Sequence, residues 1–318
     1  MSMWPIMGLT DEHLKQIRTV SPELDIKIIE NNESEIAQEI ADADILITSA
    51  IPTLPLDKAK SLKLIQTTSA GVNGLSEELV NSDVQITNAS GVHPIPIAEH
   101  VLTFMLMFSR QLFKLHRLQI TEKKWMNDYD FTPATELHGK TIGIVGLGRI
   151  GKRIAHLSKA FDMRVIALAR TEHAAEENVD EFFTHDKLDT LLGQSDFVVN
   201  ALPLTDETRH LYTLEKFKKM KPTSFFINIG RGPTVDEEDL IFALKEEVIA
   251  GAGLDVFDVE PLAQNSELWN LENVIITPHI AGWTPYYMDR VIEIFCENLK
   301  AFLENKPMPT QVDKKLGY

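Results

Sequence analysis

The sequence has 318 residues, 44% of them hydrophobic and 25% charged, which is the composition of an ordinary folded protein with chain enough for about two domains. Lysine and arginine total 31 against 47 aspartates and glutamates, and this formal net charge of −16 disfavours nucleic acid and anionic membranes as partners. Its single cysteine, Cys296, excludes an intrachain disulfide, and since we expect neither a signal peptide nor a membrane span, we predict a cytoplasmic protein.

The first part of the chain alternates short apolar runs with amphipathic segments. The runs with the length and composition of strands are residues 26–29, 45–48, 64–67 and 84–87. Strands that alternate with helices predict a parallel sheet covered by helices. The prolines within residues 93–96 are expected to interrupt regular structure at a domain junction, before one long helix over about residues 97–118.

A second alternating series begins after this helix. Its predicted strands are residues 141–145, 165–169, 197–200, 225–229, 251–254 and 274–277. A last helix is predicted over about residues 285–304. Its sequence pattern does not indicate against which domain it packs.

A glycine-rich turn follows the strand predicted at 141–145 and precedes a helix predicted at about 150–161. Glycines in this position permit a tight turn, and they let backbone N–H groups at the helix N-terminus approach a pyrophosphate, which the helix dipole favours. The order of strand, glycine turn and helix predicts a dinucleotide site in preference to a purely structural turn. The predicted cofactor residues of this turn are Gly146, Gly148, Arg149, Ile150 and Gly151.

The end of the second strand of such a unit distinguishes NAD from NADP. An NAD site places a carboxylate there to bind the ribose 2′-hydroxyl, but the residue in this position is Ala169. Arg170 and Thr171 follow, and a guanidinium beside a hydroxyl suits a 2′-phosphate through charge-assisted hydrogen bonds. The sequence favours NADP over NAD, with a solvated arginine at a strand end as the alternative.

Three later segments resemble the D-isomer-specific 2-hydroxyacid dehydrogenase family. They are residues 228–232, 254–262 and 277–282, and the segments 69–73 and 203–208 are also similar to the family. With the glycine turn, the resemblance covers nearly the whole chain. It implies an α/β fold of two Rossmann-like, doubly wound domains. A nucleotide-binding domain of residues 94–283 is implied to be inserted into a flavodoxin-like substrate-binding domain of residues 1–93 and 284–318.

The resemblance also implies catalytic roles. Reduction of a 2-keto acid needs a cation for the carboxylate and carbonyl, a proton donor for the developing alkoxide, and a hydride held close. By similarity Arg231 is the cation, whose planar fork can make two parallel hydrogen bonds. His279 is implied to be the acid in reduction and the base in oxidation, and Glu260 to orient its ring and favour the imidazolium.

Other contacts follow from the resemblance alone. Asp255 is implied to meet the nicotinamide carboxamide. Backbone amides of the loop that contains Ala70, Gly71 and Val72 are implied to bind the substrate carboxylate. Two further implied cofactor residues are Pro203 and Thr208.

His100 follows Glu99 on the long predicted helix, and this pair raises the question of a metal site. No second histidine at helical spacing and no cysteine cluster accompanies it, so we expect no metal. Its helix is expected to pack in the core or, as in the family, across the interface of a homodimer.

The predicted function is hydride transfer between NAD(P)H and a small anionic 2-keto or 2-hydroxy acid of D configuration, by an enzyme like a glyoxylate or hydroxypyruvate reductase. Two alternatives stay open. One is a phosphoglycerate dehydrogenase of the same family. The other is a nicotinamide-sensing binding protein like certain transcriptional co-repressors, because a fold does not by itself determine a function.

Overall fold

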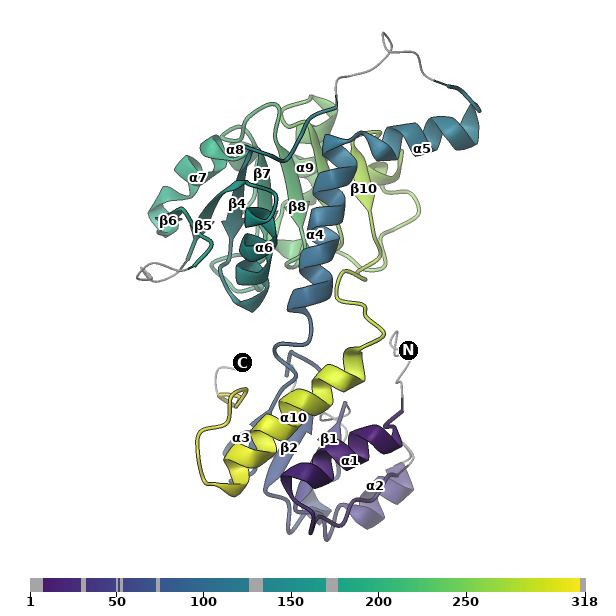
Figure 1. Cartoon of the computed structure of the whole chain (residues 1–318), viewed down its shortest axis with the longest axis vertical. Coiled ribbons are helices and arrows are strands. Elements are labelled where there is room, and N and C mark those ends of the chain that lie inside the picture. Colours follow the sequence, from purple (N-terminus) through teal and green to yellow (C-terminus); the bar gives the residue numbers. More distant parts are fainter. Residues whose placement is uncertain are drawn as a thin grey trace. The chain divides into compact units, whose positions relative to one another are not determined.

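The computed structural model describes residues 8–29, 33–49, 51, 54–72, 75–125, 134–169 and 177–314. They form two compact units (Figure 1). Unit 1 comprises the described residues up to Val92 and those from Thr284 onward, and unit 2 runs from His93 to Trp283.

Unit 2 is built on a seven-stranded parallel sheet. Its strands are β4 (Thr141–Val145), β5 (Arg164–Leu168), β6 (Glu181–Phe183), β7 (Phe197–Asn200), β8 (Phe225–Asn228), β9 (Gly251–Leu254) and β10 (Val274–Ile276). They lie in the order β10-β9-β8-β7-β4-β5-β6. The chain therefore builds outward from β4 to β6 and then returns to the other side of β4. Such a reversal leaves a crevice at the carboxyl ends of the two strands where it occurs, here β4 and β7.

Helices cover both faces of this sheet (Figure 1). One face carries α4 (Pro94–Ser109) and α6 (Arg149–Lys159), and the other carries α7 (Leu188–Gln194), α8 (Leu214–Phe217) and α9 (Glu237–Lys245). Successive side chains of a strand point to opposite faces. Phe197 and Val199 accordingly pack with α4, and Val198 packs with α7. Burial on both faces explains the continuous apolar runs in the sequence.

The predicted interruption at residues 93–96 was wrong. Pro94 is the first residue of α4, and Pro96 lies in the same first turn, where a missing N–H has no partner within the helix in any case. The single helix predicted over residues 97–118 is also two helices. Gln111 has a left-handed backbone with φ of 55°, which ends α4 and precedes α5 (Leu112–Thr121).

Unit 1 contains a three-stranded parallel sheet in the order β1-β2-β3. Its elements are α1 (Asp11–Val20), α2 (Glu33–Glu39), β1 (Ile45–Thr48), β2 (Leu64–Thr67), α3 (Glu77–Asn81), β3 (Gln85–Thr87) and α10 (Tyr287–Leu303). Ile17 of α1 and Phe295 of α10 share an apolar cluster with Ile45 and Ile47 of β1. The last helix of the chain therefore packs in the first unit. The α/β class with parallel sheets, predicted from the alternating pattern, is confirmed.

Two strand predictions differ from the structure. Residues 26–29 form no strand: Ile26 packs partly buried beside α1 and α10, but Ile28 is 59% exposed, so the run is not held on both faces. Conversely, β6 (Glu181–Phe183) was not predicted. It is short and begins with a charged residue, and only its backbone pairing with β5 and the burial of Phe183 define it.

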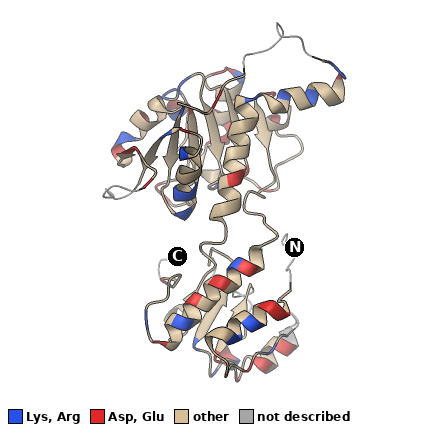
Figure 2. Cartoon of the chain, in the orientation of Figure 1, with Lys and Arg blue, Asp and Glu red and all other residues tan. Residues whose placement is uncertain are grey.

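Charged residues lie mainly on helices and loops, and the strands of unit 2 are almost free of them (Figure 2). In unit 1, α10 has acidic and basic residues along its length, and its apolar face contacts α1. Within the described ranges, no helix combines the length and the apolar character needed to cross a membrane.

Candidate active site

The carboxyl ends of the parallel strands of unit 2 meet at one edge of the sheet, and the loops that leave this edge carry the predicted residues. In the order β4, β7, β8, β9 and β10, these loops contain the glycine turn, the 203–208 segment, Arg231, Asp255 with Glu260, and His279. Neighbouring strands lie about 4.8 Å apart, so the ends of β8 and β10 are separated by roughly 10 Å. The side chains of Arg231 and His279 are long enough to reach one small acid between these strand ends.

The glycine turn after β4 fits closely against the protein on one side and is open on the other. Gly146 has φ of 106°, and a Cβ there would lie 2.9 Å from the Ala201 carbonyl oxygen. A Cβ on Gly151 would lie 2.3 Å from the Gly146 carbonyl oxygen, so the helix must approach the turn without a side chain. At Gly148 a Cβ would meet nothing within 4 Å. These are the three roles that glycines play around a pyrophosphate.

Gly148 is also the N-cap of α6, and its neighbours Arg149 and Ile150 open the helix. The helix has no acidic residue in its first turn and no side-chain cap. The positive end of its dipole is therefore not neutralised from within the helix, as an anion site requires. The residues present fit a dinucleotide pyrophosphate.

The position that distinguishes NAD from NADP is only partly described. Ala169 follows β5, is buried, and donates its N–H to the Phe183 carbonyl at 3.2 Å. It offers no carboxylate to a ribose. Arg170 and Thr171, the predicted partners of a 2′-phosphate, lie outside the described residues.

Thr208 organises the loop after β7. It is 6% exposed, and its hydroxyl donates to the Pro203 carbonyl at 2.7 Å while accepting from the Thr205 N–H at 2.8 Å. The loop packs beside the glycine turn, because the Ala201 carbonyl is the group that would meet a Cβ at Gly146. The structure therefore gives Thr208 a role in loop shape.

A buried polar network holds the backbone at Arg231. The Asn200 amide donates to Asn228 Oδ1 at 2.9 Å and to Thr234 Oγ1 at 2.7 Å, and Thr234 Oγ1 donates to the Arg231 carbonyl at 2.6 Å. The three network side chains are buried, whereas Arg231 itself is exposed and donates from Nη1 to the Gly230 carbonyl at 2.7 Å. Sequence reasoning missed Asn200 and Thr234. The available signal was a polar residue at the end of a buried apolar strand.

The loop that carries Phe257 and Glu260 joins the Arg231 loop to the His279 loop. A Cβ on Gly232 would lie 1.7 Å from the Phe257 carbonyl oxygen, so the two backbones touch only because this residue is glycine. The Phe257 N–H donates to Glu260 Oε1 at 3.0 Å, and His279 Nδ1 donates to Glu260 Oε2 at 2.7 Å. The segments that carry Arg231, Glu260 and His279 therefore form one connected group.

The His279 ring is arranged for proton transfer. Its side chain is 43% exposed and that of Glu260 is 32% exposed, so the pair is accessible from solvent. Because Nδ1–H is given to the carboxylate, Nε2 carries the proton of the charged ring or the lone pair of the neutral ring. Nε2 can thus act as an acid in one direction and as a base in the other.

Asp255 holds the backbone that follows His279 and the side chain of Thr277, which precedes it. The aspartate is 2% exposed; its Oδ1 accepts from the Ile280 N–H at 2.9 Å, and its Oδ2 accepts from the Ala281 N–H at 2.9 Å. A third bond, from Thr277 Oγ1 at 2.6 Å, reaches Oδ1. His279 has φ of 54°, a conformation that costs a residue with a side chain roughly 1 kcal/mol or more and persists only where its surroundings impose it.

His100, on α4, contacts Thr277 just before this loop. Its Nε2 is 3.0 Å from Thr277 Oγ1 and 4.0 Å from Asp255 Oδ1, and its ring contacts Phe104 edge-on. Burial lowers the pKa of His100, and the negative charge of Asp255 opposes that shift. In the described part of the chain, no three His, Cys, Asp or Glu side chains gather as ligands for a metal.

The predicted substrate loop belongs to unit 1. The Asn88 amide donates to the Ala70 carbonyl at 2.9 Å, and the Ser69 hydroxyl donates to the Gly71 carbonyl at 2.7 Å. Val72 is buried. Because side chains hold the carbonyls of this loop, the orientation of its backbone amides is fixed. Sequence reasoning missed Asn88.

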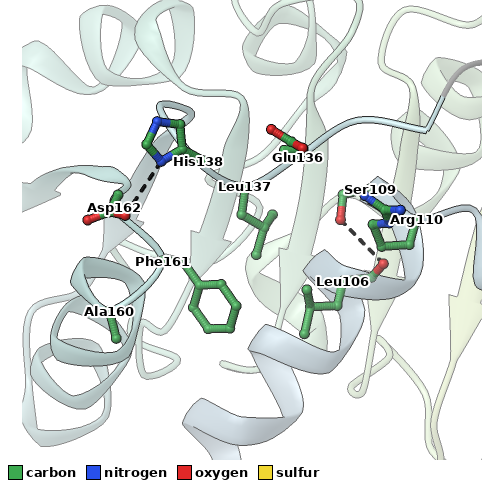
Figure 3. A pocket seen from close by; sticks show the side chains of 9 residues that line it. All are labelled: Leu106, Ser109, Arg110, Glu136, Leu137, His138, Ala160, Phe161 and Asp162. Atoms are coloured by element: carbon green, nitrogen blue, oxygen red, sulfur yellow. Dashed lines mark hydrogen bonds and ion pairs between the residues drawn. The ribbon is translucent and has the colours of Figure 1, made fainter.

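A separate hollow of about 340 Å³ lies at the amino ends of β4 and β5 (Figure 3). Its lining residues are Leu106, Ser109, Arg110, Glu136, Leu137, His138, Ala160, Phe161 and Asp162. His138 Nδ1 lies 3.5 Å from Asp162 Oδ2. This is the edge of the sheet opposite to the glycine turn, and none of the predicted site residues lines the hollow.

Comparisons with known proteins agree on one family. The model described as "D-isomer specific 2-hydroxyacid dehydrogenase, NAD binding domain" matches residues 102–281. The chain is 38% identical over 292 residues to a glyoxylate reductase of Thermofilum pendens, covering 90% of this chain and 86% of that one.

Two solved structures are similar over almost the whole chain. A D-isomer specific 2-hydroxyacid dehydrogenase family protein from Aeromonas salmonicida has a TM-score of 0.81 and 34% identity, and the match covers 95% of this chain and 96% of that one. A D-isomer specific 2-hydroxyacid dehydrogenase from Xanthobacter autotrophicus, in complex with NADPH and MES, has a TM-score of 0.81 and 30% identity. That match covers 99% of this chain and 98% of the other.

Proposed function

The chain belongs to the D-isomer-specific 2-hydroxyacid dehydrogenase family, and from this membership we propose that it reduces a small 2-keto acid, with glyoxylate as the first substrate to test. It is an NAD(P)-dependent oxidoreductase of that family. The observation that carries the proposal for its active site is the pair formed by His279 and Glu260, which is joined through Phe257 to the loop of Arg231.

The glycine turn and the start of α6 are the proposed cradle of the cofactor. Gly146 and Gly151 allow the backbone to turn and the helix to close on it, and Gly148 leaves room where a pyrophosphate would approach. A bound dihydronicotinamide supplies a hydride to the carbonyl carbon. Pro203 and Thr208 are proposed to border the same cofactor, and Asp255 to accept from its carboxamide.

Arg231 and His279 are the proposed catalytic residues. The guanidinium binds the substrate carboxylate and polarises the carbonyl oxygen. As the carbon accepts the hydride, the oxygen becomes an alkoxide, and His279 Nε2 donates its proton to that oxygen. Glu260 holds the imidazolium before this step and orients the neutral ring afterwards. In oxidation the same nitrogen removes the hydroxyl proton.

The loop of Ala70, Gly71 and Val72 is the second proposed contact for the substrate carboxylate. The support is that its carbonyls are held by Asn88 and Ser69, which leaves its amides in a fixed orientation. Backbone amides bind a carboxylate without adding a titratable group to the site.

We propose NADP as the preferred cofactor. The support is the absence of a carboxylate at Ala169, the presence of Arg170 and Thr171 in the sequence, and the NADPH bound in the related Xanthobacter structure. Arg170→Ala should raise the KM for NADPH and leave that for NADH nearly unchanged, because only the phosphate partner is removed. Equal increases for both cofactors would contradict the preference.

Initial rates on a panel of 2-keto acids test the function. We expect oxidation of NADPH with glyoxylate or hydroxypyruvate. Turnover confined to substrates that carry a phosphate would favour the phosphoglycerate dehydrogenase alternative. No turnover with any acid and either cofactor, by protein that binds NADPH, would favour the nicotinamide-sensing alternative.

We also propose a cytoplasmic homodimer that acts on its substrate without nucleic acid, membrane or metal. Support for the dimer comes from α5, where Leu112 is 50% and Ile120 is 63% exposed, and from Trp125, which is 91% exposed. A second copy of the chain that packs on this segment would remove these apolar side chains from water. Light scattering should give twice the mass of one chain, and a monomer mass would refute the dimer.

A further inference from the structure

A line of side chains runs from α4 to the backbone around His279. His100 Nε2 lies 3.0 Å from Thr277 Oγ1, and Thr277 Oγ1 lies 2.6 Å from Asp255 Oδ1. Asp255 then accepts from the N–H groups of Ile280 and Ala281. The side chain of His100 is 20% exposed and that of Asp255 is 2% exposed, so water competes little for these bonds.

The chemistry of the three groups determines the direction of the bonds. A carboxylate only accepts, so the single hydroxyl proton of Thr277 goes to Asp255. The hydroxyl oxygen must then accept from His100, and Nε2 therefore carries a proton. His100 thus acts as the donor that begins the line, and it can do so as a neutral ring.

This line of hydrogen bonds ends beside His279, the residue of the loop with a left-handed backbone. The φ of His279 is 54°, and the N–H groups that follow it are the ones that Asp255 binds. If the donor on α4 is lost, the Thr277 hydroxyl loses one of the two partners that fix its orientation. The loop then loses part of what imposes its conformation.

We propose that His100 is a positioning residue for the reaction proposed above, acting through Thr277 and Asp255 on the backbone that presents His279. This inference rests on the proposed function for its catalytic meaning. Asp255 is the charged group that faces the ring, and burial keeps the pKa of His100 low, so the neutral donor is the form expected at neutral pH. The neutral form suffices for the role.

Two substitutions separate the hydrogen bond from the packing. His100→Gln keeps a neutral N–H donor near the position of Nε2, whereas His100→Met fills a similar volume without a donor. Met also preserves an apolar contact with Phe104. His138→Met, a substitution of an exposed histidine at the opposite edge of the sheet, is the matched control.

The readout that does not depend on turnover is amide hydrogen exchange at Ile280 and Ala281, measured by NMR with Ile142 of β4 as the reference. In His100→Met we expect exchange at the two loop amides to rise about fivefold, the factor that corresponds to the loss of one neutral hydrogen bond. Exchange at Ile142 should not change. His100→Gln and His138→Met should leave all three rates within about twofold of the wild type.

Kinetics give the second readout. His100→Met should lower kcat on glyoxylate by a similar factor and leave the KM for NADPH nearly unchanged, and His100→Gln should restore kcat. Unchanged exchange at Ile280 and Ala281 in His100→Met would overturn the proposal, as would an equal rise in His100→Gln or a parallel rise at Ile142. A wild type without turnover on any 2-keto acid would refute the proposed function instead, and the exchange comparison would still decide the positioning.

Discussion

Asp255→Asn tests the idea that a single buried carboxylate determines the conformation of the His279 loop. The substitution keeps the shape of the side chain and removes one acceptor. The Asp255 carboxylate accepts from Thr277, Ile280 and Ala281 through two oxygens. An amide has only one oxygen, so its NH₂ group must face one of these donors. The most favourable orientation keeps the oxygen toward Thr277 and Ile280 and turns the NH₂ toward the Ala281 N–H.

The size of the effect follows from this geometry. Losing one charge-assisted bond costs about 1.5–3 kcal/mol of stability, and leaving a buried donor without an acceptor costs about 1–3 kcal/mol. We expect the free energy of unfolding to fall by about 3 kcal/mol, which for a unit of this size lowers Tm by about 6–12 °C. Because the loop then no longer holds His279 in its left-handed conformation, kcat should fall at least about tenfold.

Thermal unfolding followed by circular dichroism measures the first effect, and NADPH oxidation measures the second. Asp258→Asn is the control, because it removes the same charge from an exposed residue of the same loop. Dinucleotide binding should be unchanged in Asp258→Asn and at most weakened in Asp255→Asn, since the glycine turn is not touched and only the proposed carboxamide contact changes. If Asp255→Asn lowers Tm by no more than Asp258→Asn does, the carboxylate does not determine the loop conformation, and the reasoning is refuted.

Three other outcomes are expected. Gly151→Ala should destabilise the protein and abolish dinucleotide binding, because its Cβ would lie 2.3 Å from the Gly146 carbonyl oxygen. Gly148→Ala should keep the wild-type Tm and weaken only dinucleotide binding, because a Cβ there meets nothing within 4 Å. Titration calorimetry measures the binding of both variants. His279→Gln should lower turnover by about 10²–10⁴ while NADPH fluorescence titration gives an unchanged Kd. Burial lowers the pKa of His100, so below pH 6.5 the unfolded chain binds a proton that the folded chain does not bind. The free energy of unfolding should therefore fall as pH falls below 6.5. In Tm measurements across pH 5–8, His100→Gln should show a smaller loss.

The sequence indicated six of the seven strands of unit 2, all but β6, because their signal is local. A parallel strand covered by helices on both faces is apolar along its whole length, and the fully buried runs at residues 141–145 and 197–200 are of this kind. The glycine turn was equally readable, since its geometry depends on consecutive residues. Predictions failed where the outcome depended on distant partners. Residues 26–29 form no strand, and a left-handed Gln111 divides a helix whose periodicity predicts continuity.

By itself, the sequence determined the class of fold, the place of the dinucleotide turn and the chemical types available for catalysis, because each of these is encoded within a few neighbouring residues. Only the tertiary structure decided that α10 packs in unit 1, that Asn200 and Thr234 hold the Arg231 backbone, and that His100 reaches Thr277 across 177 positions of sequence. Such pairings arise when the strands take their order in the sheet and bring their loops to one edge. No pattern of neighbouring residues specifies that order, so the contacts between the loops follow from the folded sheet.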